Sequence, residues 1–266
     1  MTMNHTFVIC AYKESEFLDD TTSRILGQTI PSNVLISTST PNDSISSVAK
    51  KYDLEVRVNP SGGTSARDWN FAYSQAETDF VTLAHQDDIY EPDFAKKTVE
   101  ALEKSKNPVL AYTDYYEIRH SEKGADGIRT ETNKILRYKR FMLRTIALAK
   151  GSRWLRNRVL SLGYPMNCPG STYVKRRFNS IDFIPDWQNS HDWESAIRLA
   201  GEPGDFLYIP DMLLGHRIYM ESQTTNTIGS GIRRAEDYEC FKRYWPEAIA
   251  NILIKQYAKA YESNKL

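Results

Sequence analysis

The sequence predicts an α/β protein, and two observations support this fold class. Short apolar runs alternate with segments of helical periodicity along the first 115 residues. The links between them are short, which is typical of a parallel sheet covered by helices on both faces. With 266 residues, the chain is long enough for one large domain with an appended region.

Strands and helices are expected in turn. The strands are predicted at residues 7–10, 34–37, 54–58, 79–84 and 109–112. The helices between them are predicted at residues 17–27, 45–52, 66–75 and 93–105. Later in the chain, the sequence indicates a helix at 192–200, strands at 207–210 and 213–219, and a C-terminal helix after a break at 229–231.

The composition is that of a globular protein, with 41% hydrophobic and 26% charged residues and 34 basic against 34 acidic side chains. Cys10, Cys168 and Cys240 lie far apart, which argues against a disulfide scaffold or a zinc site and fits a reducing compartment. Because the chain enters a strand at once and has no long apolar window, we expect no signal peptide, no membrane span and a cytoplasmic location.

Positive charge is concentrated in the segment 134–162. Lys134 to Arg158 contains nine basic residues and no acidic one, which leaves 25 basic against 34 acidic residues elsewhere. On a helix, an apolar stripe would lie opposite a basic one. Such a stretch suits an anionic membrane surface, through Arg137, Arg140, Arg144, Arg153, Trp154 and Arg156. The alternative is a helix packed on the protein's own core, whereas nucleic acid is not expected because no recognition motif is present.

The most informative feature is an apolar strand that ends in two adjacent carboxylates, Asp87 and Asp88, shortly before Pro92. Neighbouring carboxylates are costly unless a cation or a proton neutralises them. In an open α/β sheet, the carboxyl ends of the strands are where ligands bind. A divalent metal carrying a diphosphate would suit this place, and a solvated turn is the alternative.

Several ordered motifs from about Phe7 to Thr225 resemble the family 2 glycosyltransferases of GT-A fold. These motifs are Val8 to Glu14, Gly27-Gln28-Thr29, Asn59 through Asn70, His85-Gln86-Asp87-Asp88, His191-Asp192-Trp193-Glu194, and Gly215 to Tyr219 with Ser222 and Thr224. The chain departs from the family pattern at Ala11 and Lys13, at His85, where an acid often stands, and in the segment 37–43, where many relatives have Asp-Asp-Gly-Ser.

The resemblance implies a single Rossmann-like mixed central sheet flanked by helices, with a C-terminal acceptor-side region. Residues 1–115 would form the half that binds the nucleotide sugar, and residues 116–232, which include the basic segment, the acceptor-binding half. Residues 233–266 would form a C-terminal helical region.

The resemblance also assigns a metal site. Asp88 would coordinate Mg²⁺ or Mn²⁺ directly, and Asp87 would reach the ribose or a metal-bound water. His216 is the candidate for a third protein ligand, and a hydrogen-bonded histidine in a strand is the alternative.

Asp192 is the expected general base. It would take the proton of the acceptor hydroxyl in a single displacement that inverts the anomeric carbon, although it could also cap the helix that follows. Trp193 and Glu194 are candidates for acceptor binding, with core packing as the alternative for Trp193.

The donor is expected to be a nucleoside diphosphate sugar, with UDP as the favoured nucleotide. Its site would include Ala11, Tyr12, Glu14, Thr38, Arg67, Gln86 and Asp87. Arg67 would pair with the diphosphate, or else be a solvated helix residue. Thr38 would lie near the position where an Asp of many relatives contacts the nucleotide base.

Together these features predict a metal-dependent inverting glycosyltransferase that acts on a glycan or lipid-linked acceptor in bacterial cell-surface polysaccharide synthesis. Two alternatives remain at this point. One is an inactive relative that still binds a nucleotide sugar or a glycan, which the altered segment 37–43 would permit. The other is a nucleotidyltransferase, which would not need the motifs around Asp192 and His216.

Overall fold

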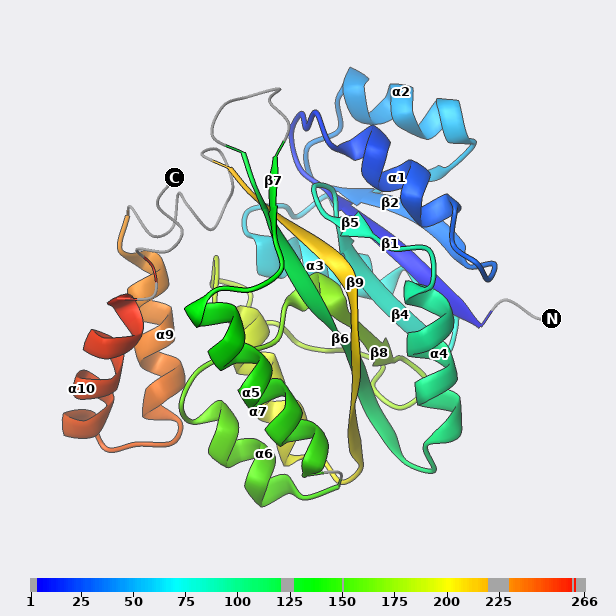
Figure 1. Cartoon of the computed structure of the whole chain (residues 1–266). Helices are drawn as coiled ribbons and strands as arrows, with labels where there is room; N and C mark the ends of the chain where they lie inside the picture. The colour runs from blue at the N-terminus through cyan, green and yellow to red at the C-terminus, as the bar shows by residue number, and fades with distance from the viewer. Residues whose placement is uncertain (1–3, 121–126, 150, 220–229, 260, 262–266) are drawn as a thin grey trace.

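The computed structural model describes residues 4–120, 127–149, 151–219, 230–259 and 261 (Figure 1). The strands are β1 (His5–Ala11), β2 (Asn33–Thr38), β3 (Glu55–Val58), β4 (Phe80–His85), β5 (Ile89–Tyr90), β6 (Pro108–Arg119), β7 (Ile128–Thr130), β8 (Ser171–Val174) and β9 (Asp205–Ile218). The helices are α1 (Leu18–Leu26), α2 (Asp43–Tyr52), α3 (Ser65–Ser74), α4 (Phe94–Lys104), α5 (Lys134–Leu148), α6 (Arg153–Leu160), α7 (His191–Gly201), α9 (Ile232–Lys242) and α10 (Glu247–Tyr257).

Within the described residues, nine strands form one sheet in the order β3-β2-β1-β4-β8-β6-β9-β5, with β7 paired to β6. β3, β2, β1 and β4 are parallel to one another. β8 is antiparallel to β4 and β6, whereas β6 and β9 are parallel. The sheet is therefore mixed, as the GT-A resemblance implies, and the alternation of strands and helices predicted for the first 115 residues is confirmed.

Strand β1 shows how side-chain alternation builds a core on each face of the sheet. Phe7 and Ile9 point to the face covered by α1, α2 and α4, and Val8 points to the face covered by α3, α5 and α7 (Figure 1). All three side chains are fully buried. Burial on both faces explains why this strand is a continuous apolar run.

Two predicted strands, 207–210 and 213–219, are one long strand in the structure. Ile209 pairs with Thr113 and Met212 with Asp114, so the two residues between Ile209 and Met212 form a bulge and β9 continues past it. The expected break was therefore wrong, because a bulge absorbs the Pro-Asp turn signal.

Strand β6 is longer than predicted, and the C-terminal region has two helices where one was predicted. β6 continues to Arg119 because its polar residues are buried with partners: Asp114 pairs with Arg140 at 2.7 Å, and Glu117 with Arg119 at 2.7 Å. The short strands β5, β7 and β8 were not predicted, since two to four residues carry little periodicity.

The structure corrects the expectation for two of the arginines assigned to a membrane surface, Arg140 and Arg156. Arg156 is fully buried, and its guanidinium donates to the carbonyls of Ala200, Glu202 and Gly204 near the end of α7, at 3.0 and 2.7 Å for the first two. Arg140 is mostly buried in its pair with Asp114. Both arginines therefore stabilise the fold and are unavailable to a membrane.

None of the described helices combines the length and the apolar character needed to cross a bilayer. Ser222 and Thr224, which belong to the last motif of the resemblance, lie outside the described residues, as do residue 229 of the predicted break at 229–231 and residues 1–3.

Candidate active site

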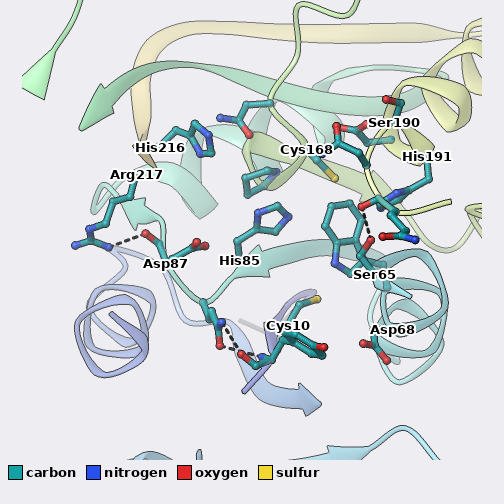
Figure 2. Close-up of a pocket in the computed structure, with 18 of the residues that line it drawn as sticks. Cys10, Ser65, Asp68, His85, Asp87, Cys168, Ser190, His191, His216 and Arg217 are labelled. Carbon is teal, nitrogen blue, oxygen red and sulfur yellow. Dashed lines mark hydrogen bonds between the residues drawn. The ribbon is translucent and has the colours of Figure 1, made fainter. Parts of the chain in front are cut away.

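A cavity of about 720 Å³ opens where β1, β4 and β9 end and α7 begins. Its wall includes Ala11 at the end of β1 with Tyr12 and Glu14 after it, Gln86 and Asp87 after β4, His216 on β9 with Tyr219 after it, and Asp192 in α7. In Figure 2, Asp87 and His216 lie to one side of His85, and Ser190 and His191, from the start of α7, lie to the other. Residues that are far apart in the sequence thus meet around one space.

The acidic pair at the end of β4 has an elaborate set of partners. The Asp88 side chain is fully buried, and its Oδ1 accepts from His216 Nδ1 at 3.0 Å and from the backbone N–H of Arg217 at 3.2 Å. Asp87 lines the cavity, and its Oδ2 accepts from the Tyr219 hydroxyl at 2.7 Å. The Arg217 guanidinium donates to the Asp87 carbonyl at 2.9 Å and pairs with Asp20 at 2.6 Å.

The two carboxyls respond to this environment in opposite directions. Burial raises the pKa of Asp87, and the charge of Asp88 raises it further. Burial also opposes ionisation of Asp88, but the charge and hydrogen bond of His216 outweigh it and lower the pKa of Asp88. Burial would lower the pKa of His216, but Asp88 raises it instead. Asp88 and His216 therefore form an ion pair beneath the cavity.

His85, Asp87 and Asp88 can bring one ligand atom each within 4.8 Å of one another. Within the described part of the chain, His85 Nε2 and Asp88 Oδ2 are buried without a hydrogen-bond partner. Unpartnered buried polar atoms are costly, and a divalent cation would satisfy them. The group therefore fits a metal ion, and its histidine, which the sequence indicated only as a departure from the family pattern, is part of it.

Asp192 faces the cavity from the first turn of α7. Its Oδ1 accepts from the backbone N–H of Trp193 at 2.7 Å. The helix begins at His191, so Asp192 lies inside it and does not occupy the N-cap position, which belongs to Ser190. Burial raises the pKa of Asp192 to about 7, although Arg233 opposes the shift, with Asp237 adding to it.

The two residues after Asp192 have buried side chains with partners inside the protein, which favours core packing over acceptor binding, although Trp193 also borders the cavity. The Trp193 indole is buried against Phe241, with ring centroids 5.0 Å apart, and its N–H donates to the Leu160 carbonyl. Glu194 is buried and pairs with Arg198 at 2.9 Å and with Arg243 at 3.3 Å.

Two of the residues expected to bind the donor also lie elsewhere. Thr38 is buried, and its hydroxyl accepts from the backbone N–H of Thr40. Arg67 is absent from the cavity wall, and its guanidinium pairs with the exposed Asp186 at 2.9 Å. By contrast, Tyr12 and Gln86 are joined by two hydrogen bonds of 3.0 Å between the Gln86 amide and the Tyr12 backbone, which tie the ends of β1 and β4 together.

Sequence reasoning missed Asp68 and Trp69, which both line the cavity. Asp68 accepts from Ser39 Oγ at 2.7 Å and from Asn59 Nδ2 at 2.8 Å. The Trp69 ring packs against His85, with centroids 4.8 Å apart, and against His191 at 4.4 Å. The stretch from Asn59 through Asn70, already noted for its resemblance, could have indicated both.

The mixed sheet and the site together define a glycosyltransferase of the GT-A fold. The chain belongs to glycosyl transferase family 2, because the family model matches residues 6–180. This result decides against a nucleotidyltransferase. A search of curated protein sequences found no match.

Solved structures show the same fold at low sequence identity. A fragment of S. aureus TarS, residues 1–349, aligns with a TM-score of 0.60 and 15% identity over 95% of this chain and 69% of that one. The same fragment solved with UDP-GlcNAc gives 0.61 and 13% over 96% and 71%. The mannosyltransferase PcManGT from Pyrobaculum calidifontis, solved with GDP-Man and Mn²⁺, gives 0.65 and 14% over 97% and 69%.

The raised pKa of Asp192 has a consequence for stability. A folded pKa near 7, above the unfolded value of about 4, means that stability is fully present below pH 4 and is lost as the pH rises to 7. The free energy of unfolding of Asp192→Asn should therefore rise relative to that of wild type by about 2–4 kcal/mol as the pH is raised from 4 to 8, measured by urea unfolding. The exposed Asp186→Asn should show no such trend, and a pH-independent difference for Asp192→Asn would contradict the assignment.

Proposed function

We propose that this chain is a metal-dependent, inverting glycosyltransferase that moves a sugar from a nucleoside diphosphate to a hydroxyl of a glycan or lipid-linked acceptor. The observation that carries the proposal is that His85, Asp87 and Asp192 line one cavity, with Asp88 buried next to the first two. A volume of about 720 Å³ is in the range of sites for small ligands.

In this reaction Asp192 accepts the proton of the acceptor hydroxyl. The acceptor oxygen forms a bond to the anomeric carbon on one face. The bond from this carbon to the diphosphate oxygen breaks on the opposite face, and the electron pair of the broken bond leaves with the diphosphate. Attack from the opposite face inverts the anomeric configuration. A carboxylate with a pKa of about 7 suits a base at neutral pH, because about half of it is ionised there and it is basic enough to take a proton.

His85, Asp87 and Asp88 would hold the divalent cation, which would neutralise the charge of the leaving diphosphate. A histidine nitrogen among the ligands favours Mn²⁺ over Mg²⁺, which prefers oxygen. For His216 we favour the alternative of a hydrogen-bonded histidine: it would hold Asp88 in place and ionised, as a histidine partner behind a metal ligand.

We place the donor nucleotide along Tyr12, Glu14 and Gln86 and favour a UDP-linked sugar. TarS supports this choice as a relative in fold that was solved with UDP-GlcNAc. Residues 1–115 would form the donor half and residues 116–232 the acceptor half, with residues 233–266 as a helical region behind it. We further propose that the enzyme is cytoplasmic and serves cell-surface polysaccharide synthesis.

Asp192→Asn should abolish transfer and spare donor binding, because the amide keeps the shape of the carboxyl but cannot take a proton. We expect kcat to fall by about 10²–10⁴-fold, with the affinity for the donor nucleotide unchanged by calorimetry. In wild type, kcat should rise with pH through a pKa near 7. Unchanged turnover of the variant would exclude Asp192 as the base.

The metal site can be tested by thermal shift with UDP, in the presence and absence of Mn²⁺. Ligand binding to the native state raises Tm by mass action, so wild type should show a larger shift when both are present. Asp88→Asn removes one ligand charge and should lose the metal-dependent part of the shift. Asp211→Asn, which breaks only an exposed pair with Lys97, should retain it. An equal shift without Mn²⁺ in wild type would count against metal dependence.

We also propose that an anionic membrane is a partner, through the exposed face of α5 and α6, two helices in contact (Figure 1). This face combines exposed apolar and basic side chains: Tyr138, Phe141, Leu148, Trp154, Leu162, Lys134, Arg137, Arg144, Arg153 and Arg158. Segment 134–162 contains no acidic residue, so pairing with a second copy would bring like charges together. Lys139, on another side of α5, lines the cavity, so a lipid-linked acceptor at the membrane would lie close to the site.

Vesicle sedimentation tests this surface. Wild type should bind phosphatidylcholine vesicles that contain phosphatidylglycerol and should bind pure phosphatidylcholine weakly. A Phe141→Ser, Trp154→Ser double variant should lose most of this binding, because both side chains are about two-thirds exposed, at 67% and 69%. Ile252→Ser, on the exposed side of α10, should not change it, and equal binding by the double variant would contradict the proposal.

A further inference from the structure

The turn that leads into α7 is held by a helix outside the part of the chain that the family model matches. The carboxylate of Glu236, on α9, is buried and accepts hydrogen bonds from three consecutive backbone N–H groups of residues 188–190, at 2.7, 2.8 and 2.8 Å. The next residue, Asp237, accepts from Ser190 Oγ at 2.6 Å. Two neighbouring acids of α9 therefore grip the turn that immediately precedes Asp192.

Glu236 holds the turn itself, because its three donors are the N-cap residue of α7 and the two residues before it. Ser190 is at the N-cap position of α7, but its side chain makes no capping bond, since its hydroxyl points to Asp237 instead. The backbone N–H of an N-cap residue has no partner within the helix; Glu236 supplies one for Ser190, whereas the N–H of Trp193 bonds to Asp192. Charge-assisted hydrogen bonds of this kind are stronger than neutral ones and fix the geometry of both partners.

The C-terminal helices also contact α7 after Asp192. The Trp193 ring packs edge-on against Phe241 of α9, with centroids 5.0 Å apart, and at a tilt against Tyr257 of α10, with centroids 5.5 Å apart. Asp192 therefore lies between two contacts with α9, the Glu236 carboxylate before it and the Phe241 ring after it. Because a misplacement of about 1 Å can cost about 100-fold in rate, these contacts bear directly on catalysis.

We propose that Glu236 is a positioning residue that sets the place of Asp192 in the cavity, so that the C-terminal helices are part of the catalytic apparatus of this enzyme. The proposal rests on the proposed function of Asp192 as the general base. Glu236 itself touches no reacting atom; it acts through the backbone of residues 188–190.

The test compares Glu236→Gln with Glu239→Gln on the same helix. The glutamine loses the charge and turns an amide N–H₂ toward the backbone donors, whereas Glu239 is exposed and pairs only with Lys242. The readouts are hydrogen exchange at the amides of residues 188–190, Mn²⁺-dependent binding of UDP, and the rate at which UDP-GlcNAc and GDP-Man release their nucleoside diphosphate.

For Glu236→Gln we expect faster amide exchange at residues 188–190 and a kcat lower by about 10–100-fold, with UDP affinity within about twofold of wild type. Glu239→Gln should match wild type throughout. Unchanged exchange, or faster exchange with unchanged kcat, would overturn the positioning role, and a parallel loss of kcat, UDP affinity and Tm would show a purely structural one. If wild type binds UDP but hydrolyses and transfers nothing, the proposed function fails, and the unaltered enzyme alone reveals it.

Discussion

The site depends on two adjacent carboxyl groups just after β4 whose pKa values are shifted in opposite directions, upward for Asp87 and downward for Asp88. Asp88 is fully buried, which would be unfavourable for an ion without partners. His216 supplies the compensating charge and Arg217 a backbone N–H, and both belong to the end of β9. The short strand β5, which follows the pair, is hydrogen-bonded to β9 and keeps these ends in register. Gly215 permits this approach, because a Cβ there would lie 2.6 Å from the ring of Tyr116.

The length of β9 follows from the same requirement. The strand runs beside β6 from Asp205 to Ile218 and delivers His216 and Arg217 more than 100 residues along the chain from the carboxylates they serve. The parallel strands β1 and β4 end at the side of the cavity lined by Tyr12, Glu14 and Gln86, where we place the donor. The antiparallel strand β8 separates the two parallel parts, and η1 (Cys168–Gly170), which precedes β8, contributes Cys168 and Pro169 to the wall.

Much of the first half could be predicted from the sequence, because β1, β2 and β4 are short apolar runs separated by periodic helices. The longer strands could not. Charged residues such as Asp114 and Glu117 are typical of a protein surface, but β6 buries these two next to Arg140 and Arg119. Arg156 shows the same limit: its partners are carbonyl groups more than 40 residues away, and no local pattern reveals a site for a buried guanidinium.

For the site, sequence reasoning found the residues at element ends and failed where it relied on neighbours in the chain. On a helix, successive residues point about 100° apart, so Asp192 can face the cavity while Trp193 faces α9 and α10. The rotation that directs the Trp193 ring to Phe241 and Tyr257 also brings α7 into contact with α9 and α10. Burial raises the pKa of Asp192 to about 7, and a residue that positions Asp192 should not lower this pKa again by donating a hydrogen bond to its carboxylate. Glu236 meets this condition because its own charge is taken up by three backbone amides and it makes no hydrogen bond to Asp192.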